Sequence, residues 1–261
     1  MTDLSKRLIT GTLGIIAIVI LLMVGMSAIR IAIFLCTLEI LLELHNAFLK
    51  IKIKINLPIL FIGAFITFLC SYFHYNLIFA LALFFLLNGF GSIILKKYRN
   101  SDMIYTIFAY FYGVFLLSLL ASINEIYIFV SALIISFSTD TFAYLTGNLF
   151  GRHKLIERIS PHKSVEGAIG GTILATIFTF LYFYFIKRAY VNIDLNFYIV
   201  ILIVFASISG QFGDLFASKI KRTVNIKDFG KILPGHGGFL DRFDSLIFVS
   251  PFVYFLYYLI V

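Results

Sequence analysis

Apolar runs of about 20 residues recur from one end of this chain to the other. A helix needs roughly 20 such residues to cross about 30 Å of hydrocarbon, because it rises about 1.5 Å per residue. A soluble domain also cannot build a hydrated surface from a chain that is 61% apolar and only 13% charged, with a mean hydropathy of +1.02. The chain is therefore predicted to be an integral membrane protein.

Nine apolar runs predict nine transmembrane helices. The predicted spans are Leu8 to Gly25, Ala28 to Leu49, Leu57 to Phe73, Tyr75 to Leu95, Met103 to Ile123, Glu125 to Gly147, Glu166 to Ile186, Phe197 to Ala217 and Phe243 to Ile260. A barrel of alternating strands is excluded because the runs lack period-2 polarity and are about twice strand length. We therefore predict an all-α polytopic bundle in a single membrane domain, with residues 1–124 mainly scaffold and residues 125–261 carrying the chemistry.

The positions of the basic residues predict the topology. If the N-terminus is cytoplasmic, the cytoplasmic segments hold all 21 Lys and Arg residues except Arg30, Lys187 and Arg188. This is the bias that short cytoplasmic loops show, and an odd number of spans then places the C-terminus on the far side. The net charge of +8 lies in short loops beside anionic lipid headgroups rather than on a soluble basic face, which excludes nucleic acid as a partner.

Three polar side chains, Glu39, Glu43 and His45, lie within the second predicted span. The two glutamates are four residues apart and share a helix face. A carboxylate in lipid is costly and usually faces the bundle interior, but these residues are near the cytoplasmic end, where side chains reach water or a helix partner. We favour that interpretation and leave the three residues outside the candidate site.

Small residues within the spans are interpreted as packing residues. Gly167 and Gly171 are four positions apart, a spacing that lets one helix approach another closely. Cys36 and Cys70 both fall inside predicted spans and are interpreted as buried apolar residues rather than a disulfide or metal ligands.

Separate segments of the C-terminal half place polar side chains at similar depth. At about 1.5 Å per residue, Asp140 lies roughly 22 Å along its span and Asp214 roughly 25 Å along its own. Between these spans, residues 159–167 form a Pro-broken polar loop that contains Lys163, and its donors suit a phosphate group.

The segment from Ser218 to Asp244 is the most polar stretch of the chain. The sequence Pro-Gly-His-Gly-Gly at residues 234–238 predicts a tight turn whose glycines expose backbone N–H groups to an anion. Asp241 and Asp244 follow at the start of the last span, where a spacing of three places them on one helix face.

Asp214 and Asp241 belong to sequential spans that a hairpin loop can hold side by side. Carboxylates gathered in this way repel unless a cation joins them, and oxygen ligands favour Mg²⁺ bound through one or two carboxylates and substrate phosphates. The surrounding basic residues suit a polyphosphate, which Arg222 or Arg242 can bind with two parallel hydrogen bonds.

These residues resemble the signature of the phosphatidate cytidylyltransferases, also called CDP-diglyceride synthases. The resemblance is carried by Ser218, Lys221, Arg222, Lys227, Asp228, Gly230, Leu233, Pro234, His236, Gly237, Gly238, Asp241, Arg242 and Asp244. The flanking Gln211, Gly213 and Asp214, residues 140–144 and the loop at 160–164 are similar to the rest of that family's cytoplasmic-side site. The family commonly has Lys and Thr where this chain has His162 and Ser164, whereas Lys163 and Glu166 keep its pattern.

The resemblance implies transfer of a cytidylyl group from CTP to phosphatidate, at the cytoplasmic face of a bacterial inner membrane. Catalytic roles are assigned to Asp214, Asp241, Asp244, Lys221 and Arg222. Substrate binding is assigned to Asp140, Lys163, Ser218, Lys219, Lys227, Asp228, His236, Gly237, Gly238 and Arg242. Mg²⁺ is expected on Asp214 and Asp241, with a second, monovalent cation left open. The expected partners are CTP, phosphatidate and membrane lipids, and the family resemblance allows a homodimer.

Two alternatives stay open. A CTP-dependent polyprenol or phytol kinase would use a similar basic and acidic site and release CDP instead of pyrophosphate. An ion-coupled transporter would use Asp140 and Asp214 as a cation site. A transport route needs polar groups open to both faces, whereas the outward halves of both spans are apolar, so the sequence favours an interfacial enzyme.

Overall fold

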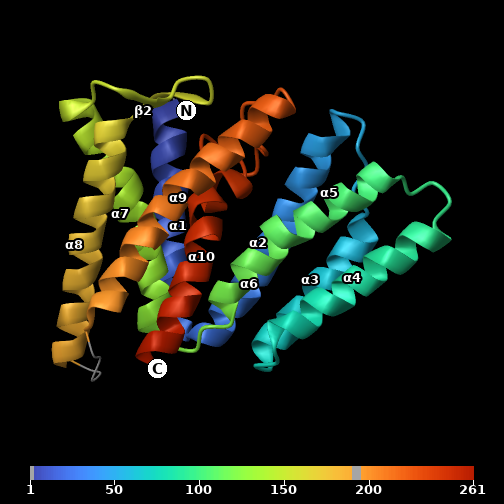
Figure 1. Cartoon of the computed structure of the whole chain (residues 1–261), viewed down its shortest axis with the longest axis horizontal. Coiled ribbons are helices and arrows are strands. Elements are labelled where there is room, and N and C mark those ends of the chain that lie inside the picture. The colour runs from blue at the N-terminus through green and yellow to red at the C-terminus, as the bar shows by residue number, and fades with distance from the viewer. Residues whose placement is uncertain (1–2, 190–194) are drawn as a thin grey trace. The chain divides into compact units, whose positions relative to one another are not determined.

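The computed structural model describes residues 3–189 and 195–261, most of which are helical (Figure 1). The helices are α1 (Asp3–Val24), α2 (Met26–Leu49), α3 (Leu57–Tyr72), α4 (Leu77–Ile94), α5 (Asn100–Tyr110), the π-helical η1 (Phe111–Phe115), α6 (Leu116–Ala121), α7 (Ile126–Phe150), α8 (Val165–Ala189), α9 (Phe197–Thr223) and α10 (Leu240–Ile260). The strands are β1 (Lys154–Ile156) and β2 (Ser160–Ser164). The prediction of an all-α polytopic membrane protein is confirmed.

Among the described residues, six helical segments are long and apolar enough to cross a membrane. They are Leu77–Ile94, Asn100–Ala121, Ile126–Phe150, Val165–Arg188, Phe197–Thr223 and Leu240–Ile260. The second of these joins α5, η1 and α6 into one run, and α1 and α3 contain shorter apolar stretches. Each of the nine predicted spans coincides with a helical segment in the described part of the chain, but membrane crossing by α1, α2 and α3, and the side of the membrane on which each terminus lies, stay predictions.

Polar side chains define where several helices begin. The side chains of Asn56 and Asn76 accept main-chain N–H groups at the starts of α3 and α4, from Ile59 at 3.2 Å and Ile78 at 2.9 Å. Such caps satisfy donors that the first helical turn leaves unpaired. The apolar runs of α3 and α4 therefore start where the sequence supplies an acceptor.

The structure corrects the expected fold at two places. Helix α9 continues past its predicted end at Ala217 to Thr223, because Lys and Arg are good helix formers whose long side chains reach water beyond the apolar turns. The loop after α7 is a short antiparallel hairpin in which Lys154 pairs with Ser164, rather than an irregular turn. The polar segment at Ser218 therefore begins on a helix.

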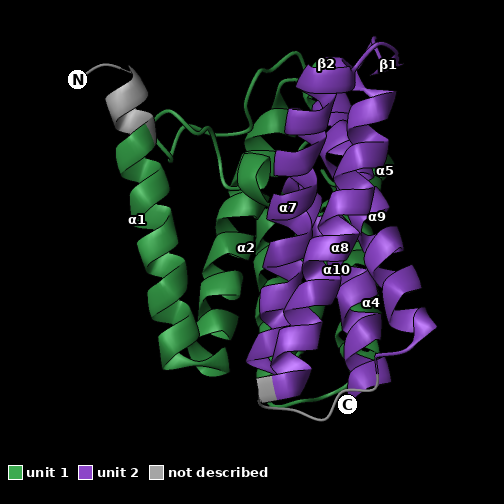
Figure 2. Cartoon of the chain, turned by 90° about the vertical axis from the view of Figure 1, so that its left-hand side faces the viewer, with its two compact units in different colours: residues 1–124, 221–243 green, residues 125–220, 244–261 purple. Residues whose placement is uncertain are grey.

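The chain divides into two compact units (Figure 2). Unit 1 comprises residues 1–124 and 221–243, and unit 2 comprises residues 125–220 and 244–261. The chain passes from unit 1 to unit 2 after residue 124, and the division into scaffold and chemistry-bearing halves stays a prediction. Residues 221–243, however, group with the N-terminal helices. That the chain is a single domain stays a prediction.

Aromatic packing forms the core of unit 1. The rings of Phe84 and Tyr110 stack with centroids 3.6 Å apart, and the Tyr110 hydroxyl lies 2.7 Å from Thr67 Oγ1. Gly63 packs directly against both rings, where a Cβ would overlap Phe84. The helices α3, α4 and α5 approach one another through this cluster.

Small residues form the seam between α7 and α8 in unit 2. A Cβ at Gly167 would lie 2.7 Å from the Ala143 carbonyl, and one at Gly171 would lie 2.7 Å from the Ala143 Cβ. The packing role predicted for both glycines is confirmed. A polar contact also crosses unit 2, where Thr139 Oγ1 on α7 lies 2.7 Å from Ser207 Oγ on α9.

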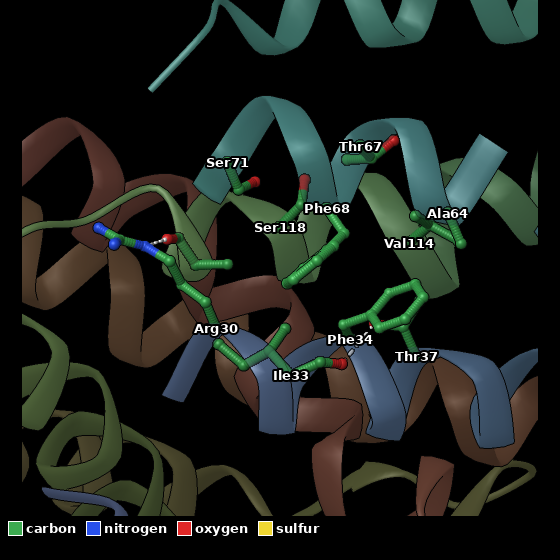
Figure 3. A pocket seen from close by; sticks show the side chains of 11 residues that line it. Arg30, Ile33, Phe34, Thr37, Ala64, Thr67, Phe68, Ser71, Val114 and Ser118 are labelled. Atoms are coloured by element: carbon green, nitrogen blue, oxygen red, sulfur yellow. Dashed lines mark hydrogen bonds between the residues drawn. The ribbon is translucent and has the colours of Figure 1, made fainter. Parts of the chain in front are cut away.

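A cavity of about 20 Å³ lies within unit 1 among α2, α3, η1 and α6 (Figure 3). This volume accommodates about one water molecule. Arg30 borders it and donates from Nε to the Ala121 carbonyl at 2.9 Å and from Nη2 to Asn124 Oδ1 at 2.6 Å. Arg30 thereby satisfies carbonyl groups at the end of α6, which is a structural role.

Candidate functional site

The segment between α9 and α10 folds around its glycines. The Leu233 N–H donates to the Gly237 carbonyl at 3.0 Å, and the His236 N–H donates to the Leu233 carbonyl at 2.8 Å. Gly235 and Gly237 have φ angles of 80° and 83°, in a region that residues with a Cβ rarely adopt. The tight turn predicted at residues 234–238 is confirmed.

The Asp241 carboxylate, in the first turn of α10, anchors this segment. Its Oδ2 accepts the N–H groups of Phe229 at 2.8 Å and Gly238 at 3.0 Å, while its Oδ1 accepts Lys221 Nζ at 2.8 Å. The side chain is only 3% exposed, so these charge-assisted bonds replace its hydration. One buried carboxylate thus joins the end of α9, the loop and the start of α10.

His236 is held from two directions. Thr10 Oγ1 on α1 lies 2.6 Å from His236 Nδ1 and donates to the Pro234 carbonyl at 3.2 Å, while Arg242 Nε donates to the His236 carbonyl at 2.9 Å. Sequence reasoning missed Thr10, because nothing in the sequence relates it to a turn more than 200 residues away.

Glu43 was also left out by sequence reasoning. Its Oε1 and Oε2 accept the N–H groups of Phe239 and Leu240, each at 2.8 Å, and the residue is 3% exposed. The sequence led us to expect Glu43 to reach water or a neighbouring helix. In the structure its carboxylate binds the N–H groups at the start of α10. The sequence indicates that Glu43 needs a partner, because it is a carboxylate within an apolar span. Only the fold shows which N–H groups bind it.

In unit 2, Lys163 on β2 forms an ion pair with Asp214 on α9. Lys163 Nζ lies 2.6 Å from Asp214 Oδ2, and Ser218 Oγ donates to Asp214 Oδ1 at 3.5 Å. The two charged side chains are 27% and 31% exposed, so solvent and small ligands reach them. The structure thereby brings together three of the predicted site residues.

Glu166 fixes the hairpin that carries Lys163. In the first turn of α8, its carboxylate accepts the main-chain N–H groups of Arg152 at 3.0 Å and His153 at 3.2 Å, and Oε1 lies 2.5 Å from His153 Nδ1. Ser164 Oγ accepts the Gly167 N–H at 3.1 Å and so caps the same helix. The loop is therefore ordered by its own polar residues.

Asp140 and Asp244 both lie beside Ser245 within unit 2. Ser245 Oγ donates to Asp140 Oδ2 at 3.4 Å, and the Ser245 N–H donates to Asp244 Oδ1 at 2.7 Å. Asp140 is exposed on α7, whereas Asp244 is buried on α10. The remaining predicted residues have exposed side chains at the end of α9 or in the following loop: Lys219, Arg222, Lys227 and Asp228.

The donor chemistry of Asp214 and Asp241 fits a divalent cation. Each carboxylate has one oxygen facing a lysine ammonium, at 2.6 Å and 2.8 Å, and Asp241 is oriented by backbone donors as metal ligands commonly are. Within each unit, the described residues form no cluster of three or more His, Cys, Asp or Glu side chains suited to a metal. Each aspartate, taken within its own unit, therefore offers carboxylate oxygens of the kind that bind Mg²⁺ together with substrate phosphates.

Comparison with known proteins gives consistent matches. The sequence model of the cytidylyltransferase family matches residues 5–260. Proteins named phosphatidate cytidylyltransferase are similar to this chain: one from Bacillus subtilis is 44% identical over 131 residues, covering 50% of this chain and 46% of the relative. One from Staphylococcus haemolyticus is 47% identical over 121 residues, covering 46% and 45%, and one from Thermotoga maritima is 42% identical over 158 residues, covering 57% of each. The chain spans about half the length of the curated relatives it matches.

Proposed function

Because the chain belongs to the cytidylyltransferase family, we propose that it transfers the cytidylyl group of CTP to phosphatidate, giving CDP-diacylglycerol and pyrophosphate. Similar proteins named phosphatidate cytidylyltransferase support this choice of substrate. The observation that carries the proposal is the loop of unit 1, in which the motif residues Lys221, Gly238 and Asp241 meet through hydrogen bonds. This arrangement presents basic side chains beside a fixed carboxylate, as a nucleoside triphosphate requires.

In the proposed reaction, an oxygen of the phosphatidate phosphate attacks the α-phosphorus of CTP. A new oxygen–phosphorus bond forms while the bond from the α-phosphorus to the oxygen bridging the β-phosphorus breaks, and pyrophosphate leaves. The attacking phosphate monoester is already anionic, so no side chain has to remove a proton. Lys221, Arg222 and Arg242 stabilise the charge of the departing pyrophosphate, and Lys163, Ser218 and His236 orient phosphate oxygens.

We also propose that Asp214 and Asp241 hold Mg²⁺ together with substrate oxygens. When bound, the ion would neutralise charge on the reacting phosphates. Each aspartate is paired with a lysine, and Lys163 and Lys221 would be available to phosphate oxygens if a cation replaced them on these carboxylates. The proposed substrate-binding residues also include four exposed ones: Asp140, Lys219, Lys227 and Asp228. Asp244 is the remaining residue proposed to be catalytic.

The six long apolar helices make the chain a membrane protein, and its similar proteins are bacterial. We propose that the site faces the cytoplasm, where CTP is present, because the predicted cytoplasmic loops contain nearly all basic residues. Contact with membrane lipids follows from delivery of phosphatidate within the bilayer. A homodimer is proposed on the family resemblance alone, and the mass of the protein in detergent tests it.

The deciding experiment uses the purified full chain in detergent with phosphatidate, Mg²⁺ and CTP labelled separately at its α- and γ-phosphates. We expect α-label in the lipid, γ-label in pyrophosphate, and loss of both on addition of EDTA. Entry of γ-label into an added polyprenol or phytol would instead identify a kinase. If neither label moved although the protein was folded, nucleotidyl transfer would be rejected and ion flux tested next.

A further inference from the structure

We propose that Glu43 on α2 is a positioning residue that fixes the start of α10, and with it Asp241, in the geometry needed for turnover. The turnover measurement that tests this inference rests on the proposed function, whereas the hydrogen-exchange measurement does not. Glu43 lies outside the sequence motif, and all of its contacts lie within unit 1.

The hydrogen bonds of Glu43 continue those of Asp241 along the chain. Gly238 donates its N–H to Asp241, and the next two residues, Phe239 and Leu240, donate theirs to Glu43. Three consecutive amides are therefore bound by two carboxylates. Because the first amides of a helix have no partner within it, Glu43 completes the N-terminus of α10 from another helix.

Burial makes this contact obligatory. Glu43 is 3% exposed, and an ionised carboxylate without water is stable only when its oxygens accept strong hydrogen bonds. The N–H groups of Phe239, just before α10, and Leu240, its first residue, provide them at 2.8 Å each. Neither partner can withdraw without leaving the other unsatisfied, so within unit 1 the first turn of α10, residues 240–243, is held to α2.

Two motif glycines leave space for the same carboxylate. A Cβ built on Gly230 or on Gly238 would overlap Glu43 Oε1, whereas φ at neither residue demands glycine. Close approach to Glu43 therefore accounts for the absence of a side chain at both positions. The motif is shaped around a residue nearly 200 positions earlier in the chain.

The test compares Glu43→Gln with Glu39→Gln in the full chain. Glu39 lies one turn earlier on α2 and, among the described residues, makes no hydrogen bond to the loop. The Gln amide accepts through one atom only, so one α10 amide loses its acceptor. We expect hydrogen exchange in peptides covering residues 228–243 to quicken about tenfold while α3 and α4 stay protected, and turnover to fall roughly 10–100-fold. Glu39→Gln should match the unsubstituted chain in both measurements.

Unchanged exchange and turnover in Glu43→Gln would overturn the proposal, and so would faster exchange spread evenly over unit 1, which would indicate a general stabilising role. Gly238→Ala disturbs the same contact from the loop side and is the second test if Glu43→Gln does not fold. On its own it should impair turnover and quicken exchange over residues 228–243, and no change in either would also overturn the proposal. Where Glu43→Ala folds, Gly238→Ala should add little to its effect. If the unsubstituted chain moves no label from CTP, the proposed function fails, while the exchange measurement still decides whether Glu43 holds the loop.

Discussion

Asp241 in unit 1 and Asp214 in unit 2, the two aspartates proposed to bind a cation, are held by different kinds of hydrogen bond. In unit 1, backbone N–H groups donate to the buried carboxylates of Asp241 and Glu43. In unit 2, the partly exposed Asp214 is bound by the side chains of Lys163 and Ser218. Backbone donors cannot change partners unless the chain moves, whereas side chains exchange partners at low cost. Unit 1 therefore supplies a fixed loop, and unit 2 supplies groups that can adapt to a ligand.

Asp241→Asn tests the fixed loop and has the largest expected effect. The Asn amide has a single acceptor oxygen for the donors of Phe229, Gly238 and Lys221, and each buried donor left unpaired costs about 1–3 kcal/mol. We expect turnover to fall at least about 100-fold and the midpoint of thermal unfolding to drop as well. Labelled CTP and a melting curve in one detergent measure both. Full stability of this variant would contradict the anchoring role.

Asp214→Asn tests the adaptable group. We expect a comparable loss of turnover, because this carboxylate is proposed to share a cation with the substrate. The unfolding midpoint should shift by no more than about 3 °C, since a partly exposed ion pair contributes roughly 0–1 kcal/mol. The contrast between the units fails if this variant unfolds as readily as Asp241→Asn.

Gly171→Leu tests whether the seam between α7 and α8 contributes to the stability of unit 2 without affecting turnover. A side chain here meets Ala143 of α7, and overpacking costs typically about 1–3 kcal/mol. We expect a lower unfolding midpoint with unchanged turnover per folded molecule. Gly14→Leu is the matched control, because a Cβ on Gly14 of α1 meets nothing within 4 Å. Equal melting of both variants would show that the seam is not tightly packed.

Thr10→Val measures how strongly α1 supports the loop. Valine keeps the shape of threonine but removes the hydroxyl that contacts His236 and Pro234. We expect turnover to fall about 3–10-fold, with Thr10→Ser close to unchanged. Thr12→Val is the control, because the Thr12 hydroxyl donates to Leu8 of its own helix. Equal turnover of Thr10→Val and Thr12→Val would show that the Thr10 hydroxyl of α1 does not support the site.

Lys97→Ala has the smallest expected effect. Lys97 is exposed between α4 and α5, and its charge is interpreted as a topology signal only. Turnover and the unfolding midpoint should both stay within measurement error. A marked loss of turnover would extend the functional surface of unit 1 beyond the loop.

The sequence predicted those features that depend on local pattern. Apolar length located the helices, and the Gly-rich turn and the glycine pair of α8 fold as expected. It did not predict the continuation of α9 to Thr223 or the hairpin before α8, because loop composition sets no unique geometry there. Glu43 and Thr10 were missed for a different reason. Their partners are remote in sequence, and a hydrogen bond leaves no periodic signal in either segment.

The bond between Glu43 and the start of α10 also constrains how the protein is made. Glu43 and Phe239 are 196 positions apart, so at about 5–20 residues per second α2 leaves the ribosome roughly 10–40 s before its partner. During this interval an ionised carboxylate in an apolar helix has no main-chain donors and is expensive within hydrocarbon. The nascent α2 must therefore keep Glu43 near water or protonated until the last loop arrives. The hydrogen bonds of Glu43 to Phe239 and Leu240 can form only after nearly the whole chain has been synthesised.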